Sequence, residues 1–332
     1  MELILGDIRE DELDLVFAYE QELEVDFPTS EHIYPRIPHV VHQTWKDIHV
    51  PSEFHANVRS FVELHPDFDY FFWTDASARI LIRARHPNLL ALFDNIVEPV
   101  RRADLLRYVV LYEYGGVYAD IDTQCLRPLH RVLNKYACVL SPEPYEHASL
   151  IFNTEFMVTN SIMFCRANHP FFKQVLENIA DFNHFSQDID ATGPNFLTFQ
   201  LNVFDKNGGK VLTNKHAKSQ LEVKHGSRKK GKVSNKLEPD DDDFIFIPSS
   251  QYFQNDLDPV RFDQFRRLCA NFINLNNIQK RGCVTLKDRG MKYRQSKYAY
   301  TKHFFYHTGY KIIPEGKTSI SELVPSVKIY KG

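Results

Sequence analysis

The chain has few cysteines, five among 332 residues, and their number is odd. No two of them have the Cys-x-x-Cys spacing of a metal or redox motif. This pattern does not fit a disulfide framework or a structural zinc site. It predicts free thiols in a reducing compartment. The five residues are Cys125, Cys138, Cys165, Cys269 and Cys283.

The sequence also lacks a long hydrophobic run. A membrane-spanning helix needs about 20 mostly apolar residues, but the longest such stretch, 108–119, is interrupted by Glu113 and by Gly115-Gly116. The first residues, MELILGDIREDELDLVF, lack the basic start of a secretory signal. We therefore expect no transmembrane segment and a soluble, cytoplasmic protein, unless a partner holds it at the Golgi or another membrane.

The chain has no large excess of either charge: it contains 40 Lys and Arg and 43 Asp and Glu, which gives a net charge of −3. A nucleic-acid-binding domain usually carries a basic surface, so this balance argues against a nucleic-acid partner. Hydrophobic residues make up 43% of the chain and aromatic residues 13%, enough for a large core. The composition therefore indicates a folded globular protein and excludes a disordered one.

Predicted strands and helices alternate along the chain, which indicates an α/β fold with a mainly parallel sheet. Pro99 is typical of the first turn of a helix, and Gly115-Gly116 is typical of its C-terminal end. These residues therefore mark the start and the end of one predicted helix. The strands are expected at 37–45, 70–73, 117–119, 137–140, 156–159 and 244–247, and helices at 52–64, 76–85, 99–114 and 171–179.

The domain organisation follows from where this alternation begins and where it is broken. Residues 1–35 are predicted to be a polar lead-in, and residues 36–332 a single domain. At about 217–243 the basic run HGSRKKGK precedes the acidic run EPDDDD, with almost no apolar residue. Such a stretch is typical of an exposed insertion that neutralises its own charge.

Asp120 and Asp122 carry the strongest chemical signal. They directly follow the apolar strand residues 117–119, and residues at i and i+2 of a strand share a face. Ligands of open α/β sheets bind beyond the carboxyl ends of strands. Two carboxylates at such an end suit Mg²⁺ or Mn²⁺ and a substrate phosphate. A bound cation would favour departure of a diphosphate.

The preceding helix adds a second pair, Asp104 and Arg107. Their spacing of three places them on neighbouring faces of the helix. One interpretation is a surface ion pair of small energetic value. The other is that both side chains point to the cleft and hold the hydroxyl groups of a sugar.

These motifs together resemble glycosyltransferase family 32, whose members contain a "sugar-binding region containing DXD motif". The family includes initiation-specific α-1,6-mannosyltransferases and mannosyl-inositol-phosphoceramide synthases. The resemblance covers roughly half of the chain. It rests on the segments Ile37-Pro38, His42-Gln43-Thr44-Trp45, Phe72-Trp73-Thr74-Asp75, Arg102-Ala103-Asp104-Leu105-Leu106-Arg107-Tyr108, Gly115-Gly116-Val117-Tyr118-Ala119-Asp120-Ile121-Asp122, Asn160-Ser161-Ile162-Met163, His169-Pro170-Phe171 and Thr192-Gly193-Pro194.

The resemblance implies a GT-A type, Rossmann-like nucleotide-sugar-binding fold with a mixed sheet flanked by helices. It also implies Mn²⁺ (or Mg²⁺) dependence and retention of anomeric configuration. Carried over by position, Asp122 would be the main metal ligand. Asp120 would bind the donor ribose, or the metal through water, and Asp104 and Arg107 would hold the transferred sugar.

The resemblance also implies a nucleotide pocket. His42, Gln43, Thr44 and Trp45 would line it, and Trp45 is a candidate for stacking on the base, although core packing explains it equally well. Asn160 would lie near the sugar or the acceptor.

The chain departs from the family at its end, where members commonly carry a histidine, a short spacer and Ser-Trp. The corresponding tail here is His303-Phe304-Phe305-Tyr306-His307-Thr308-Gly309-Tyr310. We predict His307 as a third metal ligand, with Tyr310 in the place of the tryptophan.

The predicted function is transfer of a hexose from GDP-mannose or a UDP-hexose to a hydroxyl group of a glycan, glycolipid or protein. The alternative is a nucleotide-sugar-binding protein that has lost catalysis. A phosphatase with Asp-x-Asp fits less well, since that motif requires Thr or Val where this chain has Gln124.

Overall fold

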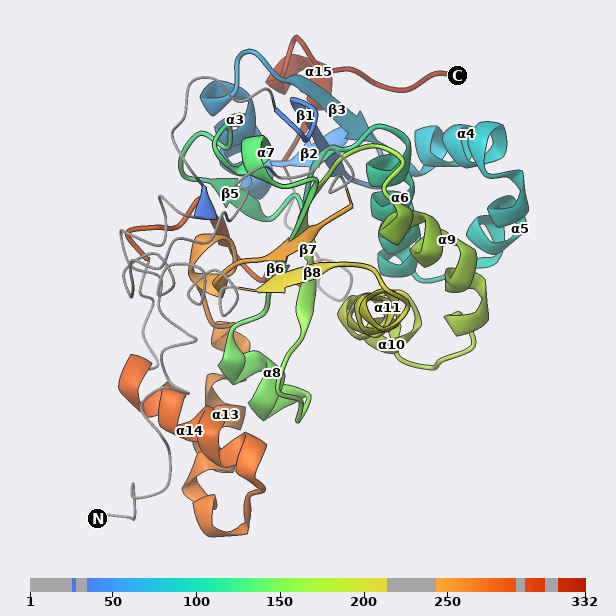
Figure 1. Ribbon diagram of the computed structural model, residues 1–332. Coiled ribbons are helices and arrows are strands. Elements are labelled where there is room, and N and C mark those ends of the chain that lie inside the picture. The colour runs from blue at the N-terminus through green and yellow to red at the C-terminus, as the bar shows by residue number, and fades with distance from the viewer. Residues whose placement is uncertain (1–25, 28–34, 214–242, 291–295, 308–315) are drawn as a thin grey trace, which may run out of the picture.

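A computed structural model describes residues 26–27, 35–213, 243–290, 296–307 and 316–332. A seven-stranded sheet runs through the middle of the molecule, with helices on both sides (Figure 1). This arrangement confirms the predicted α/β class with a mixed sheet flanked by helices. The predicted insertion lies almost wholly outside the described residues, and so does most of the predicted lead-in, although Phe27 is fully buried.

The strand order in the sheet is β3-β1-β4-β7-β6-β9-β8. Neighbouring strands are parallel except β7, which is antiparallel to both β4 and β6. The strands are β1 (Val40–Thr44), β3 (Asp69–Trp73), β4 (Gly116–Ala119), β6 (Cys138–Pro142), β7 (Val158–Cys165), β8 (Val211–Thr213) and β9 (Ile245–Ile247). Two small antiparallel sheets pair β10 (Thr301–His303) with β5 (Thr123–Cys125), and β11 (Lys317–Ser319) with β2 (His49–Pro51).

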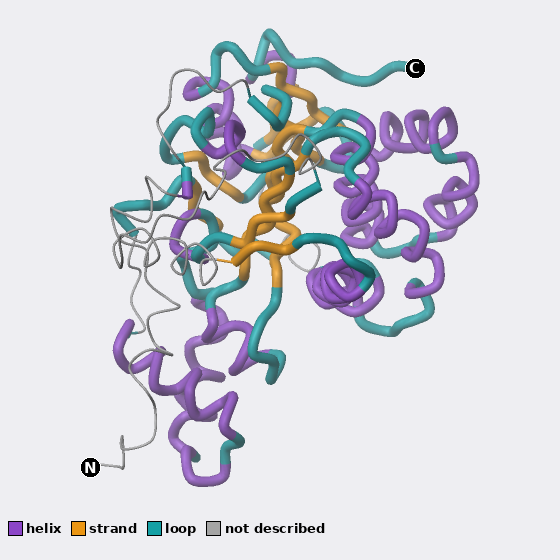
Figure 2. The backbone as a smooth tube through the Cα atoms, viewed as in Figure 1, coloured by secondary structure: helices purple, strands orange, loops and turns teal. Residues whose placement is uncertain are grey.

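Each face of the sheet carries its own hydrophobic core, because successive strand residues point to opposite faces. Tyr118 and Met163 pack on one side, while Val117 and Phe164 pack on the other. The strands are therefore enclosed between helices, as Figure 2 shows. The first face is covered by α4 (Asp75–Arg85), α5 (Pro87–Asn95), α6 (Pro99–Glu113), α9 (Pro170–Phe182) and α11 (Pro194–Lys206), with α10 (Asp188–Ala191) beside them; the second by η1 (Ser52–Phe54), α3 (His55–Leu64), α7 (Val132–Lys135) and α15 (Ile320–Leu323).

A group of helices extends from one end of the sheet and has a small core of its own (Figure 1). Phe265 is its fully buried centre, and Leu150, Leu275 and Leu286 pack with it. The group comprises α8 (Tyr145–Ile151), α13 (Phe262–Ala270) and α14 (Asn277–Arg289), with the short turns η3 (Pro259–Arg261) and η4 (Phe272–Asn274) nearby. The turn η2 (Ser250–Tyr252) instead packs on the second face of the sheet through Tyr252.

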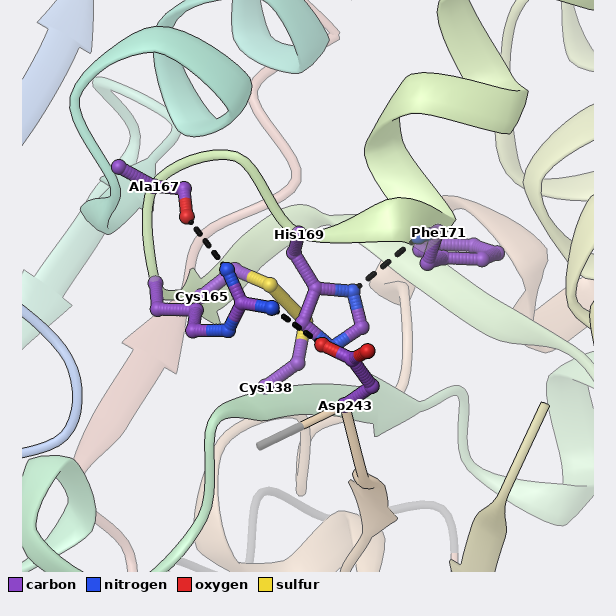
Figure 3. The surroundings of a disulfide bond; sticks show 7 residues. Cys138, Cys165, Ala167, His169, Phe171 and Asp243 are labelled. Carbon is purple, nitrogen blue, oxygen red and sulfur yellow. Dashed lines mark hydrogen bonds and ion pairs between the residues drawn. A yellow bond between two sulfur atoms is a disulfide. The ribbon is translucent and has the colours of Figure 1, made fainter. Parts of the chain in front are cut away.

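The prediction of five free thiols is wrong, because the structure contains two disulfides. Cys138 and Cys165 face each other across β6 and β7, next to His169 and Phe171 (Figure 3). Cys269 and Cys283 join α13 to α14. The register of β6 with β7 and the packing of α13 on α14 bring these cysteines together. The spacing of cysteines in the sequence shows neither of these arrangements. Disulfides persist in oxidising compartments, so the cysteines do not support the prediction of a reducing compartment.

In the part of the chain that the structure describes, no helix combines the length and the hydrophobicity that crossing a bilayer requires.

Candidate functional site

The site begins with the sharp turn between α6 and β4. Gly115 and Gly116 have positive φ angles of 63° and 98°, a region that favours glycine. A Cβ atom on Gly116 would lie 2.4 Å from the carbonyl oxygen of Val40. A Cβ atom on Gly115 would lie 2.5 Å from the N of Ala167, which follows β7. The two glycines therefore let β4 start close between β1 and β7, in the interior of the sheet.

Asp120 and Asp122 follow at that carboxyl end. The N–H of Asp120 donates to Ser161 O at 2.8 Å, and the N–H of Thr123 donates to Asp120 O at 2.9 Å. These bonds turn the chain immediately after the strand. Asp122 is only 7% exposed, so its carboxylate needs partners.

His303 is the partner of Asp122. Strands β10 and β5 pair so that His303 lies opposite Thr123. This register places Nε2 of His303 3.1 Å from Oδ1 of Asp122. The N–H of Tyr306 donates to Oδ2 of the same carboxylate at 3.0 Å, and the N–H of Phe304 donates to Asp122 O at 3.0 Å.

The structure brings His303, and not His307, beside the two aspartates. Nε2 of His307 lies 3.0 Å from Oδ2 of Asp258 instead. Phe305 and His307 both adopt φ near 52°, and this turn carries the chain away from Asp122 after Tyr306. His303 and His307 stand four residues apart in one aromatic tail, and the sequence offers no means to choose between them. Tyr310 lies outside the described residues.

The two carboxylates and the imidazole at the site shift one another's pKa values. Burial alone would lower the pKa of His303, but Asp122 and Asp120 raise it to about 9. Burial alone would raise the pKa of Asp122, but His303 and the Tyr306 N–H hold it below its usual value. Burial and the neighbouring Asp122 raise the pKa of Asp120, against the opposing charge of Arg107.

Asp120, Asp122 and His303 can hold a divalent cation. Their ligand atoms lie within 4.8 Å of one another, and Nδ1 of His303 is buried without a hydrogen-bond partner among the described residues. Two carboxylates with one imidazole form a donor set that suits Mn²⁺. A bound cation would replace the proton that His303 shares with Asp122. The residues therefore fit a metal centre.

Asp104, Arg107 and Asn160 form one buried network beside this centre. Oδ1 of Asp104 accepts from Nδ2 of Asn160 at 2.8 Å and Oδ2 accepts from Thr192 at 2.7 Å. Arg107 bridges the two carboxylates, at 3.2 Å from Asp104 and 3.2 Å from Asp120. Burial raises the pKa of Asp104, and Arg107 opposes that shift.

The network shows that Asp104 and Arg107, three residues apart on α6, point into the protein. Arg107 is 4% exposed and Asp104 2%, so they are no surface ion pair. Tyr118 supports Asp120 from the strand, since its hydroxyl donates to Oδ1 at 2.9 Å. The sequence did not single out Thr192 or Tyr118 as side chains of the site.

The segment from His42 to Trp45 forms β1 and the residue after it. His42 accepts a hydrogen bond from the Trp73 indole at 3.0 Å, and its Nε2 lies 2.9 Å from Gly115 O. The amide of Gln43 donates to Asp120 O at 3.3 Å. Thr44 donates to Trp73 O at 3.1 Å. These polar groups are therefore engaged with protein, and they brace the turn that carries Asp120.

Trp45 differs from these residues because its indole nitrogen is buried and has no hydrogen-bond partner in the described part of the chain. Its ring lies 5.5 Å from that of Phe54, which lies 5.3 Å from that of Tyr306. An aromatic row therefore leads from Trp45 toward the residue that binds Asp122.

Comparison with known proteins agrees with these motifs. Residues 51–139 match the family model described as "glycosyltransferase sugar-binding region containing DXD motif". This stretch contains Asp104, Arg107, Asp120 and Asp122. The resemblance seen in the sequence is thereby confirmed.

The chain is also similar to named fungal proteins. It is 35% identical over 185 residues to inositol phosphoceramide mannosyltransferase 3 of Schizosaccharomyces pombe, covering 53% of this chain and 49% of that protein. It is 32% identical over 184 residues to mannosyl phosphorylinositol ceramide synthase SUR1 of Saccharomyces cerevisiae, covering 54% and 44%. The chain thus spans about half the length of these relatives.

Among solved structures, the PaToxG glycosyltransferase superposes with a TM-score of 0.43 at 15% identity, covering 58% of this chain and 76% of that one.

Proposed function

We propose that this protein is a glycosyltransferase that moves a hexose, with mannose as the first candidate, from a nucleotide-sugar to an acceptor hydroxyl. The observation that carries the proposal is the grouping of Asp120, Asp122 and His303 at the carboxyl end of β4, within 4.8 Å. The matched DXD region, which includes both aspartates, supports it.

A divalent cation, Mn²⁺ or Mg²⁺, would be held by Asp120, Asp122 and His303. When bound, it would neutralise the negative charge that develops on the departing nucleoside diphosphate. Arg107 and the hydroxyl of Tyr118 hold Asp120 in place, so the carboxylate needs little rearrangement to bind.

The buried network on α6 is proposed to bind the transferred sugar. Asp104 is fixed by Asn160, Thr192 and Arg107, which leaves it a rigid acceptor for sugar hydroxyl groups. Trp45 would contact the base, with its buried indole N–H free to donate to the nucleotide. Such fixed groups favour transfer by orienting the donor before reaction.

Retention of anomeric configuration is part of the proposal. The acceptor hydroxyl would enter on the face that the diphosphate leaves, and a phosphate oxygen of the leaving group would take its proton. No side chain is then required as general base.

The names of the relatives suggest the substrates. Both are named for mannosyl transfer to an inositol-phosphate ceramide. We therefore place GDP-mannose first among donors, before UDP-hexoses, and an inositol-containing glycolipid first among acceptors, before glycans and protein hydroxyls. The two disulfides favour work in an oxidising compartment, such as the secretory pathway.

The test is to incubate the purified full chain with Mn²⁺ and each of a panel of GDP- and UDP-sugars, with and without inositol phospholipid. Released nucleoside diphosphate is measured for the wild type and for Asp122→Asn. Metal-dependent release with one donor, lost in the variant, is the expected result. If one donor binds but no nucleoside diphosphate is released with any acceptor, the result would instead favour a protein that has lost catalysis.

A further inference from the structure

A second group of possible metal ligands lies at the opposite edge of the sheet from the aspartate pair. His39 directly precedes β1, and Asp67 lies two residues before β3, at the amino ends of two parallel strands. His130 precedes α7. The three side chains come from three separate segments, yet their ligand atoms lie within 4.8 Å of one another.

The geometry of this group is defined by short contacts. Nδ1 of His39 is 3.4 Å from Oδ2 of Asp67, and Nε2 of His130 is 3.0 Å from the same oxygen. In a tetrahedral zinc site with bonds of 2.0–2.2 Å, neighbouring ligand atoms are about 3.3–3.6 Å apart. The separation of 3.4 Å between His39 and Asp67 falls in that range, and the 3.0 Å between His130 and Asp67 is slightly shorter, so a bound ion requires only a small outward shift of His130.

Packing holds both imidazole rings in position. The ring of His39 stacks on Phe68 at 4.3 Å, and the ring of His130 meets the edge of Phe68 at 4.9 Å. The pairing of β1 with β3 fixes this contact, since the N–H of Asp69 donates to His39 O at 3.0 Å. The ligands are therefore arranged before any ion arrives.

His65 fixes the segment that carries His130. Its Nε2 accepts from the N–H of Leu129 at 2.8 Å, and its Nδ1 donates to Phe61 O at 2.7 Å. Both of its nitrogens are thus occupied, so His65 supports the site without being a ligand. Supporting contacts of this kind orient ligands in known metal sites.

We propose that His39, Asp67 and His130 form a Zn²⁺-binding site that nothing in the proposed transferase reaction requires. Two imidazoles and one carboxylate are a ligand set that zinc takes readily. The side chains of His39, Asp67 and His130 are 30%, 51% and 39% exposed, which leaves an entry path and room for a water as fourth ligand. A bound ion would tie the starts of β1 and β3 to the segment before α7.

The site shares no residue with Asp120, Asp122 and His303, so the two can be tested separately. The background for the test is the full chain carrying Asp122→Asn and His303→Ala, which removes the first candidate metal centre. Zinc is the probe, because two imidazoles and one carboxylate are a ligand set that it takes readily. Chelator-stripped protein is titrated with Zn²⁺ by calorimetry, and bound zinc is counted after desalting.

One zinc per chain, and a rise in Tm when it binds, are expected in this background. Asp67→Asn and His130→Gln should each weaken binding by at least about 10-fold. His86→Gln is the matched control, because His86 pairs with Glu113 at 2.9 Å but belongs to no group of three possible metal ligands among the described residues. This variant should bind zinc unchanged.

Two results would overturn the proposal. Zinc that binds equally well to Asp67→Asn and His130→Gln must occupy another site. A folded background protein that binds no zinc would show that the three residues form only ion pairs. Circular dichroism of each variant establishes that it is folded.

Discussion

His303 faces Asp122 at 3.1 Å, although the two residues lie far apart in the sequence. The contact exists because β10 returns to pair with β5, the strand that directly follows the aspartates. A segment near the end of the chain thus completes a site that begins at the end of β4. The following turn also contributes, since the Tyr306 N–H donates to Asp122 at 3.0 Å.

Asp122→Asn should lower turnover by at least about 10²-fold, the scale for loss of one pre-organised charged group at a reacting centre. The amide keeps the shape of the side chain but removes its negative charge. The measurement is nucleoside diphosphate release with Mn²⁺ and the donor found in the panel. Asp94→Asn is the control, because Asp94 pairs with Arg79 on the surface. Wild-type turnover in Asp122→Asn would refute the proposed centre.

Substitutions of the two tail histidines should have different effects. His303→Gln should raise the Mn²⁺ concentration for half-maximal activity by at least about 10-fold, since it removes a proposed ligand. His307→Gln should leave that concentration unchanged, because His307 lies against Asp258. Metal titrations of both variants under identical conditions measure this. A higher Mn²⁺ requirement in His307→Gln than in His303→Gln would instead identify His307 as the ligand.

Stability should fall as the solution becomes acidic, in part through His42. Burial lowers the pKa of His42 from 6.5 to about 4. Between these values the unfolded chain binds a proton that the folded protein does not, so the free energy of unfolding decreases as pH falls from 6.5 toward 4. The shifted pKa of His42 accounts for a total loss of about 3 kcal/mol in the free energy of unfolding.

Urea unfolding at pH 7.5, 6 and 5 measures this loss. His42→Gln is the comparison, since an amide can still donate to Gly115 O but does not titrate. Its stability should depend less steeply on pH than that of the wild type. Equal slopes would show that His42 does not contribute.

Gly116→Ala should destabilise the fold more than Gly208→Ala. Both glycines have φ above 90°, so both substitutions carry the left-handed cost of about 1–2 kcal/mol. Only at Gly116 would the new Cβ meet backbone, 2.4 Å from Val40 O, whereas nothing lies within 4 Å at Gly208. The difference should be about 1–3 kcal/mol. Denaturant unfolding of both variants measures it, and equal losses would contradict the close approach of β4 to β1.

Much of the fold could be predicted from local patterns. The helix from Pro99 ends at Glu113, just before Gly115-Gly116, as expected. The helix predicted at 76–85 forms at Asp75–Arg85 and begins after Thr74, whose side chain caps it. These elements depend on residues close in sequence, such as caps, breakers and apolar spacing. The antiparallel direction of β7 did not follow from its composition, because strand direction depends on the connections of the whole sheet.

The sequence by itself determined that Asp120 and Asp122 would end a buried strand, and that one helix would carry Asp104 and Arg107. Spacing and hydrophobic pattern contain that information. The structure chose between the surface and the cleft for this second pair, because it buries both side chains and places Arg107 against Asp120. Only the tertiary structure decided that His303 joins the aspartates, that Cys138 meets Cys165, and that His39, Asp67 and His130 converge. Each of these contacts depends on which strands pair and in what register. Register is set by the packing of the whole domain, and no local run of residues specifies it.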